Sequence, residues 1–456
     1  MRWMVMPAAL LLALGGSPVL AAGAADLPLQ QDAWRDSGVP WQAPRSQADW
    51  WLAFGSQRLP QLQAQARAAN PGLLSAQAAI AKARATLAET AADGSVQLSA
   101  SASRQHSGGA SSSQLGPALS YSVDWWGQQA AQHQAAAVRL AASEASRDAT
   151  ALTLESEVAR QYFSWLALQW QQQLAARQLA AMQQRSALLQ QQVAQGSKAA
   201  YEWAALQQDV ASQTASVATL NLSLQQAFAA LAVLCGQTPQ DFRLSADAAL
   251  GAEELAALQQ PYPAPLQPAA LLLQRPDIRA ADATLQAAQA DIAAARAALY
   301  PTLTFSWQGV LSKVAGGPSQ WVATAAGALA ATLYDGGRLR AGVRYSEAEW
   351  QLQLQAWRST VLAAIAEADN AMQAMAAYRQ AMTALDAQLQ AAEQQQRASD
   401  ARYRLGAIDK ASWLAQQEAT LAVHQSWIEM RGKLLSASAS LYEALGGAPQ
   451  AAPAGG

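Results

Sequence analysis

Residues 354–392 decide the fold, and they read LQAWRSTVLAAIAEADNAMQAMAAYRQAMTALDAQLQAA. Apolar side chains recur in this stretch at the first and fourth positions of every heptad, which is the seam pattern of a coiled coil. All twelve of these positions are apolar: Leu354, Trp357, Val361, Ala364, Ala368, Ala371, Met375, Tyr378, Met382, Leu385, Leu389 and Ala392. The surrounding sequence predicts one helix over 338–405, about 100 Å long at the rise of an α-helix. A globular domain cannot bury a helix of that length, whereas the wall of a tube can.

The chain contains two copies of one unit, offset by about 210 residues. Gly406 follows Gly196 by 406 − 196 = 210 residues, and Trp413 follows Trp203 at the same interval. In the heptad phase shifted by this interval, and starting one heptad later, residues 151–189 have nine of twelve seam positions apolar; the exceptions are Gln161, Gln172 and Ser186. Each copy predicts a helix (59–91 and 268–298), two strands, a long helix (129–195 and 338–405), a tight turn and a second long helix.

Two pairs of short segments alternate between apolar and polar residues with period two. They predict strands over 96–103, 115–123, 302–308 and, with weaker alternation, 322–333, joined by polar loops over 106–113 and 312–320. Such segments resemble outer-membrane strands. Four strands cannot close a lipid-facing barrel, so we expect the chain to oligomerise, each subunit giving four strands. Aromatic residues where strand meets helix predict a membrane-interface belt: Trp125, Trp126, Tyr300 and Tyr334.

The first 24 residues predict a secretory signal peptide. Arg2 precedes a short apolar stretch over 7–14, and small residues over 19–24 offer cleavage sites. We expect a mature terminus near Gly23 or Ala25, without a lipid-bearing Cys. The only cysteine is Cys235, so no intrachain disulfide is possible.

Composition excludes several classes of protein. Only 14% of residues are charged and the net charge is −2, which lacks the basic footprint of a nucleic-acid partner. No run of 18 apolar residues follows the signal peptide, so no transmembrane helix is expected. The remaining way into a membrane is a closed barrel.

No catalytic or metal constellation is expected, and no cofactor. His106, His133 and His424 are far apart in sequence and near no paired carboxylates. Met372, Met375 and Met382 share one helix, and their thioether sulfurs are the kind of ligand that soft metals prefer. Two of them occupy the heptad seam, which favours core packing. Cys235 is expected to be a small buried residue.

The domain plan follows from these boundaries. We expect a signal peptide over 1–24 and an N-terminal extended segment over 25–57. The first repeat spans 58–240, a linker 241–267 and the second repeat 268–447, followed by a flexible tail over 448–456.

Several motifs resemble the outer-membrane efflux protein family (TolC-like), specifically its OprM-like multidrug-efflux branch. They are Trp50–Gly55, the most specific motif Leu271–Ala280 (LLLQRPDIRA), Ala295–Pro301, Tyr334–Arg338 and Leu441–Gly447. The resemblance implies an α+β membrane protein: a homotrimeric outer-membrane barrel with four strands per chain, continued by a long coiled-coil periplasmic tunnel. It implies docking on a periplasmic adaptor protein and an inner-membrane efflux pump. The sequence departs from the pattern of this branch in two ways. It lacks the lipidated N-terminal Cys of many members, and its turn Asp124–Gly127 is more aromatic than usual.

The resemblance also assigns sites. The turns with Gly196 and Ser197, and with Gly406 and Ala407, would contact the adaptor. Asp400, Arg402 and Arg404 would form a gate at the constriction, since the equivalents in the first copy are Gln190, Gln192 and Ala194. The alternative is an Asp-to-Arg pair four residues apart on a solvated helix face.

The leading hypothesis is a passive exit duct for small toxic compounds expelled by a proton-driven pump. Two alternatives stay open at this point. One is a conduit for ATP-driven polypeptide export. The other is a soluble periplasmic coiled-coil adaptor, which the period-two segments and the duplicated plan disfavour.

Overall fold

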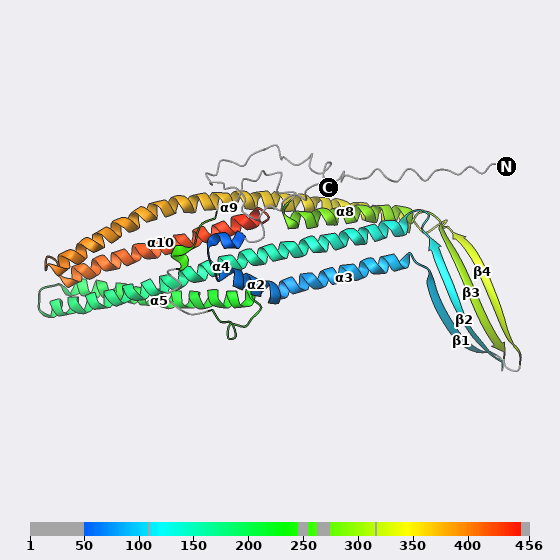
Figure 1. Cartoon of the computed structure of the whole chain (residues 1–456), viewed down its shortest axis with the longest axis horizontal. Coiled ribbons are helices and arrows are strands. Elements are labelled where there is room, and N and C mark those ends of the chain that lie inside the picture. The colour runs from blue at the N-terminus through cyan, green and yellow to red at the C-terminus, as the bar shows by residue number, and fades with distance from the viewer. Residues whose placement is uncertain (1–49, 108–109, 245–253, 262–273, 315–316, 448–456) are drawn as a thin grey trace. The chain divides into compact units, whose positions relative to one another are not determined.

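A computed structural model describes residues 50–107, 110–244, 254–261, 274–314 and 317–447 (Figure 1). The expected signal peptide and tail lie outside the described residues, as do parts of the N-terminal segment and linker. The described chain divides into two compact units. One contains Ala76–Arg147 and Pro276–Leu362, and the other contains Asp148–Arg275 and the chain from Ala363 onward, together with residues up to Ser75. Each unit therefore draws on both sequence repeats.

The long helices repeat at one interval. α4 spans Gln128–Ala194 and α9 spans Arg338–Arg404, 67 residues each. α5 (Ala200–Leu234) and α10 (Lys410–Ala444) both have 35 residues. Every one of these bounds is shifted by 210 residues between copies (338 − 128 and 410 − 200). The internal duplication is thus confirmed, and the ends of α4 and α9 fall within one residue of those predicted.

The first helix of the first copy is interrupted, contrary to the single helix expected over 59–91. α2 (Leu59–Ala69) ends before Asn70, and α3 (Pro71–Asp93) begins at the proline. Asn70 is extended, with ψ 123°, because a residue before proline is sterically disfavoured in the helical region. In the second copy α8 spans Pro276–Ala297, again beginning at a proline. Residues 268–273, where a helix was expected to begin, lie outside the described part.

The residue before each proline donates a side-chain hydrogen bond to the last helix of its own repeat. Asn70 Nδ2 donates to the Leu234 carbonyl at 3.0 Å, and Arg275 Nη1 donates to the Ala444 carbonyl at 2.9 Å. The two acceptors are 444 − 234 = 210 residues apart and end α5 and α10 respectively. Each bond satisfies a carbonyl that the end of a helix leaves without an intrahelical partner. The duplication therefore extends from sequence to tertiary contacts.

The four strands form one antiparallel sheet in the order β1-β2-β3-β4 (Figure 1). β1 spans Gln97–Ser107, β2 Ala110–Val123, β3 Thr302–Val314 and β4 Ser319–Ala330. The predicted loops over 106–113 and 312–320 are therefore too long. Ladder hydrogen bonds continue through polar residues such as His106↔Ser111 and Ser312↔Gln320, which alternation of hydrophobicity does not reveal.

The helices of the first unit follow the same order as the strands. Ion pairs join α3 to α4 (Arg84–Glu144, 3.2 Å), α4 to α8 (Arg139–Asp291) and α8 to α9 (Arg296–Glu347, 2.7 Å). Each pair is largely exposed, so each adds little stability. Together they define α3-α4-α8-α9 as the order of neighbours.

The second unit holds the main apolar core. The 3-10 helix η1 (Trp50–Phe54) packs on α4 and α10, with Trp50 stacked on Tyr442 at 4.4 Å and Phe54 at 4.9 Å from Phe163. None of the twelve seam positions of α9 is exposed. Met372, Met375 and Met382 are buried in this unit against Leu434 and Leu441. They pack as core residues, as the heptad pattern indicates.

Helix α5 departs from one expectation. It is the single helix among the described residues that is long and apolar enough to cross a membrane by length and composition. Its apolar character comes from Ala, Val and Leu spread between polar residues, among them Asn221, Ser223 and Gln225. One such helix is weak evidence that the chain crosses a membrane in this way. Only 17% of its most apolar 18-residue stretch is buried in the structure. An apolar helix left this exposed by its own chain needs another covering surface.

Candidate functional site

The two turns between long helices have one backbone shape. Gly196 and Gly406 have φ of 73° and 71°. In the first turn Gly196 N donates to Val193 O and Ser197 N to Gln192 O; in the second, Gly406 N donates to Tyr403 O and Ala407 N to Arg402 O. This is the Schellman arrangement, which satisfies the last helix carbonyls. All four predicted turn residues are exposed.

The two turns differ in chemistry. Asp409 caps α10 by accepting from Ser412 N at 2.9 Å, and this bonding lowers the pKa of its carboxyl group. The equivalent Ala199 has no side-chain cap, and there Lys198 pairs with Glu202 at 3.1 Å. The repeated backbone thus presents two different surfaces.

Asp400 is held across the second hairpin rather than by the arginines beside it. Its Oδ1 accepts from Trp413 Nε1 and from Gln396 Nε2, both at 2.7 Å. Arg404 Nε donates to the Asp400 main-chain carbonyl at 3.3 Å instead of to the carboxylate. Arg402 is exposed. The structure therefore brings Asp400 and Arg404 together without the side-chain pair that the solvated-face alternative assumed.

A second bond of the same kind lies two heptads further from the turn. Trp427 Nε1 donates to Asp386 Oδ1 at 2.7 Å. Asp386 precedes Asp400 by 14 residues and Trp427 follows Trp413 by 14, so both pairs are symmetric about the turn. The first hairpin lacks this bond, because Gln190 and Ala176 replace the acids. Trp203 Nε1 there has no partner among the described residues.

Trp413 and Gln396 are the site residues that sequence reasoning missed. In the sequence, Trp413 stands out only as a landmark of the repeat, 210 residues after Trp203. Its ring also stacks on Tyr403 at 5.2 Å. The sequence feature that could have predicted the Trp413 contact is an acid and a tryptophan at similar distances on either side of the turn between α9 and α10.

An ion pair links the two hairpins. Arg185 on α4 lies 2.8 Å from Glu418 on α10, whose side chain is 10% exposed. Burial raises the pKa of Glu418, and the Arg185 guanidinium opposes that rise. Near the same hairpin, burial lowers the pKa of His424, and Glu393 at 3.6 Å opposes that shift.

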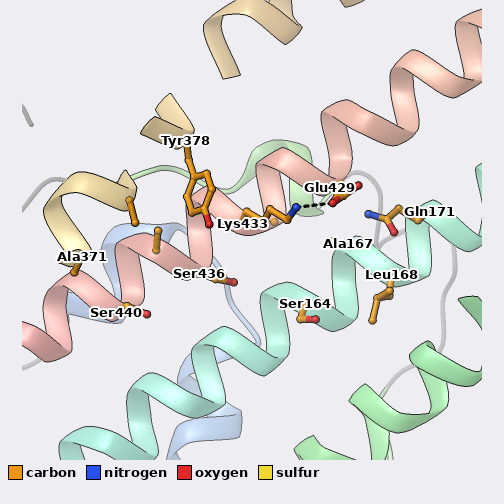
Figure 2. A pocket seen from close by; sticks show the side chains of 13 residues that line it. Ser164, Ala167, Leu168, Gln171, Ala371, Tyr378, Glu429, Lys433, Ser436 and Ser440 are labelled. Carbon is orange, nitrogen blue, oxygen red and sulfur yellow. Dashed lines mark hydrogen bonds and ion pairs between the residues drawn. The ribbon is translucent and has the colours of Figure 1, made fainter. Parts of the chain in front are cut away.

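A hollow of about 540 Å³ lies between α4, α9 and α10. Figure 2 shows Tyr378 and the ion pair of Lys433 with Glu429 (2.5 Å) among mostly small side chains. The pair is an ordinary contact four residues apart along α10. No group of three or more His, Cys, Asp or Glu that could hold a metal is found in the described part of the chain.

The sheet has one apolar face, and strand register defines it. Residues directly opposite in neighbouring strands share a face, so Leu98, Leu119, Trp307 and Ala325 form one row. Four further rows complete the apolar face: Ala100, Pro117, Gly309, Ala323; Ala102, Leu115, Leu311, Trp321; Tyr121, Phe305, Gly327; and Val123, Leu303, Leu329. The opposite face carries Ser, Gln, Thr, Ala, Gly and Val.

The predicted aromatic belt gathers at the helix end of the sheet. Trp126 stacks on Tyr300 at 4.6 Å and donates its Nε1–H to the Pro301 carbonyl at 2.8 Å. Trp125 and Tyr334 are exposed. An exposed apolar ring with a polar tip is suited to a membrane–water interface.

Comparison with known proteins agrees with this geometry. Residues 62–237 and 268–447 match the model of the family described as outer membrane efflux protein. The chain is similar to the pyoverdine export outer membrane protein OpmQ of Pseudomonas aeruginosa, with 33% identity over 429 residues and 87% of each chain covered. It is 27% identical over 334 residues to the toluene efflux pump outer membrane protein TtgC of Pseudomonas putida, covering 72% of this chain and 67% of that one.

The fold also resembles a solved structure, that of the outer-membrane channel OprN. The TM-score is 0.76 at 24% sequence identity, covering 92% of this chain and 97% of the other. At this identity the likeness is one of fold.

Proposed function

The chain belongs to the outer membrane efflux protein family, and from this premise we propose that it is the homotrimeric exit duct of a tripartite efflux system. The observation that carries the proposal is the open four-stranded sheet with one apolar face, joined to two long helical hairpins. Cargo would pass along the polar side of the sheet, with a periplasmic adaptor and a proton-driven inner-membrane pump delivering it. Conduction is passive, and no catalytic step is assigned.

Three copies account for the free edges of the sheet. Among the residues that the structure describes, β1 and β4 each pair with a single strand, which leaves a row of backbone donors and acceptors unpaired on either edge. Such edges do not occur in contact with lipid. Pairing β4 of one subunit with β1 of the next would close a ring of twelve strands and satisfy both edges.

We propose small compounds as the cargo. Relatives are described by export of pyoverdine and efflux of toluene. The uncharged polar face of the sheet favours no particular charge on the cargo, so selection would lie in the pump.

The test of the duct combines conductance and efflux. Purified full-length protein should conduct ions in planar bilayers, and deletion of the gene should lower tolerance to a panel of small toxic compounds. Re-expression should restore that tolerance. A protein that inserts as trimers but conducts nothing, in a strain whose tolerance is unaffected by deletion, would contradict the proposal.

The gate is proposed at the second hairpin. Three-fold symmetry would place three Asp400 carboxylates around one mouth, with Arg402 and Arg404 beside them. Trp413 keeps each carboxylate on its own hairpin through a charge-assisted bond, worth about 1.5–3 kcal/mol. Asp400→Ala should change cation selectivity, and Arg402→Ala or Arg404→Ala should raise conductance.

A matched pair of tryptophan variants isolates the gate bond. Trp413→Phe keeps a ring to stack on Tyr403 but removes the donor that holds Asp400 on its own hairpin. Because this bond is proposed to keep the gate in place, its loss should raise the single-channel conductance. Trp427→Phe makes the same change at Asp386, two heptads away, and should leave conductance unaltered. Equal conductance in both variants and in wild type would place the constriction elsewhere.

A further inference from the structure

The membrane sheet carries basic side chains but no acidic ones. Residues 95–123 and 301–334, which include all four strands and both hairpin loops, contain no Asp or Glu. Their basic residues are Arg104, His106 and Lys313. Arg104 and Lys313 are both exposed, and neither side chain makes a hydrogen bond or ion pair among the residues that the structure describes.

Strand register puts these cations on the apolar face. Arg104 lies opposite Ser113, Ser113 opposite Lys313, and Lys313 opposite Ser319. This cationic row is the next one beyond Ala102, Leu115, Leu311 and Trp321 on the same face. The two cations are two strand spacings apart, about 10 Å.

The height of the cationic row matches a membrane boundary. The five apolar rows from Leu303 to Leu311 span about 27 Å along the strand at 3.4 Å per residue. A strand tilt of 35–45° reduces this to about 20 Å, comparable with the apolar band of outer-membrane barrels. The cationic row lies at the hairpin-loop end, opposite the ends where the strands join helices. Because the helices belong to the periplasmic portion, this is the outer surface.

Charge in this position needs an anion from outside the chain. The opposite face at the same height carries Gln105 and Ser312, so the cations point away from the channel. Outside them lies the outer leaflet, which is built from a glycolipid with phosphate groups. Arginine binds phosphate through two parallel bonds and lysine as a point charge.

We propose that Arg104 and Lys313 form a cationic girdle that binds the phosphate groups of outer-leaflet glycolipid. The inference rests on the trimeric barrel proposed above. In a ring of twelve strands, the girdle places a cation on every second strand, alternating Arg and Lys with Ser113 and Ser319 between them. The lipid phosphates supply the negative charge that the sheet lacks.

The test uses full-length trimers and the lipid itself. Lipid A that co-purifies with the trimer from outer membranes is quantified by mass spectrometry for wild type and for Arg104→Gln/Lys313→Gln. Retention should fall about fivefold for each cation removed. In wild type, added bisphosphorylated lipid A should raise the melting temperature of delipidated trimers, whereas phosphatidylethanolamine and fully dephosphorylated lipid A should not.

A permuted variant is the matched control. Arg104→Gln/Gln105→Arg with Ser312→Lys/Lys313→Ser keeps composition and net charge but moves both cations to the channel face. It should lose lipid A like the double Gln variant. Equal retention in wild type and either variant, or an equal melting shift with all three lipids, overturns the girdle.

These outcomes are separable from failure of the duct. Trimers that conduct normally and retain lipid A regardless of the substitutions would remove only the girdle. A wild-type chain that neither trimerises nor conducts would remove the proposed function itself.

Discussion

At Gly196 and Gly406, one backbone angle decides how a pair of long helices turns back. Both residues have φ close to +70°, a conformation that costs residues with a Cβ about 1–2 kcal/mol. No heavy atom lies within 4 Å of a Cβ built at either position. A substitution there is therefore strained by backbone conformation and not by crowding.

This yields a prediction for docking. Gly196→Val or Gly406→Val should deform the exposed turn and abolish efflux while trimers stay intact. Ala199→Val adds a β-branched side chain three residues later, where the backbone is already extended, and should retain efflux. Drug tolerance of a deletion strain carrying each variant is the measurement. Normal tolerance with both glycine variants would remove these turns from the docking surface.

At the scale of elements, the bond between Arg185 and Glu418 joins two hairpins that the sequence treats as separate. Removing the guanidinium by Arg185→Ala leaves a buried carboxylate without its partner, which should cost about 1–3 kcal/mol at neutral pH. Thermal unfolding of solubilised trimers measures this loss. Lys198→Ala removes an exposed pair on one hairpin and should leave the melting temperature almost unchanged.

The pH dependence of this pair has a definite sign. Burial raises the pKa of Glu418, so the folded protein favours the neutral acid more than the unfolded chain does. The resulting stabilisation is present below the ordinary carboxyl pKa and is lost as pH rises through the raised value. Arg185→Ala should raise that pKa further and widen the difference in melting temperature between pH 5 and pH 8. The double variant Arg185→Ala/Glu418→Gln should not show this larger difference in melting temperature. If the larger difference persists in the double variant, Glu418 is excluded as its source.

At the scale of the whole molecule, the duplication predicts contacts between subunits. Within one chain α10 approaches α4 so closely that a Cβ on Gly432 would lie 2.8 Å from that of Ala167. Shifting each position by 210 residues gives Leu222 on α5 and Ala377 on α9. If the trimer continues the same pattern around its axis, Leu222 meets Ala377 of the next subunit. That contact would cover the apolar face of α5.

Cysteine pairs test this arrangement. Leu222→Cys/Ala377→Cys should cross-link neighbouring subunits into covalent oligomers on non-reducing gels. Gly432→Cys/Ala167→Cys is the control and should form a bond within one chain. The native Cys235 is buried and is replaced by Ser in both. Failure of the first pair to cross-link, with success of the second, would exclude this subunit contact.

The sequence by itself determined the features that depend on local periodicity. The heptad seam of α9 and the strands that alternate around Leu119 and Trp307 follow from side chains a few positions apart, and the shift of 210 residues follows from comparing the two copies along the chain. The break at Asn70 was equally local, since Pro71 restricts the residue before it, and it could have been predicted. The resemblance to the family came from separate motifs, of which Leu271–Ala280 is the most specific.

Tertiary structure alone decided which side chains meet. Trp413 reaches Asp400, and Arg185 reaches Glu418, because of how far one helix is displaced along another, which no period specifies. The same holds for the sheet: alternation predicts a loop at Lys313 and a strand that ends before Arg104, and only strand register puts the two cations in one row on the apolar face. A shift of register by one residue would send one of them to the opposite face. The physical reason is that periodicity fixes a face, whereas the relative displacement of neighbouring elements fixes a contact.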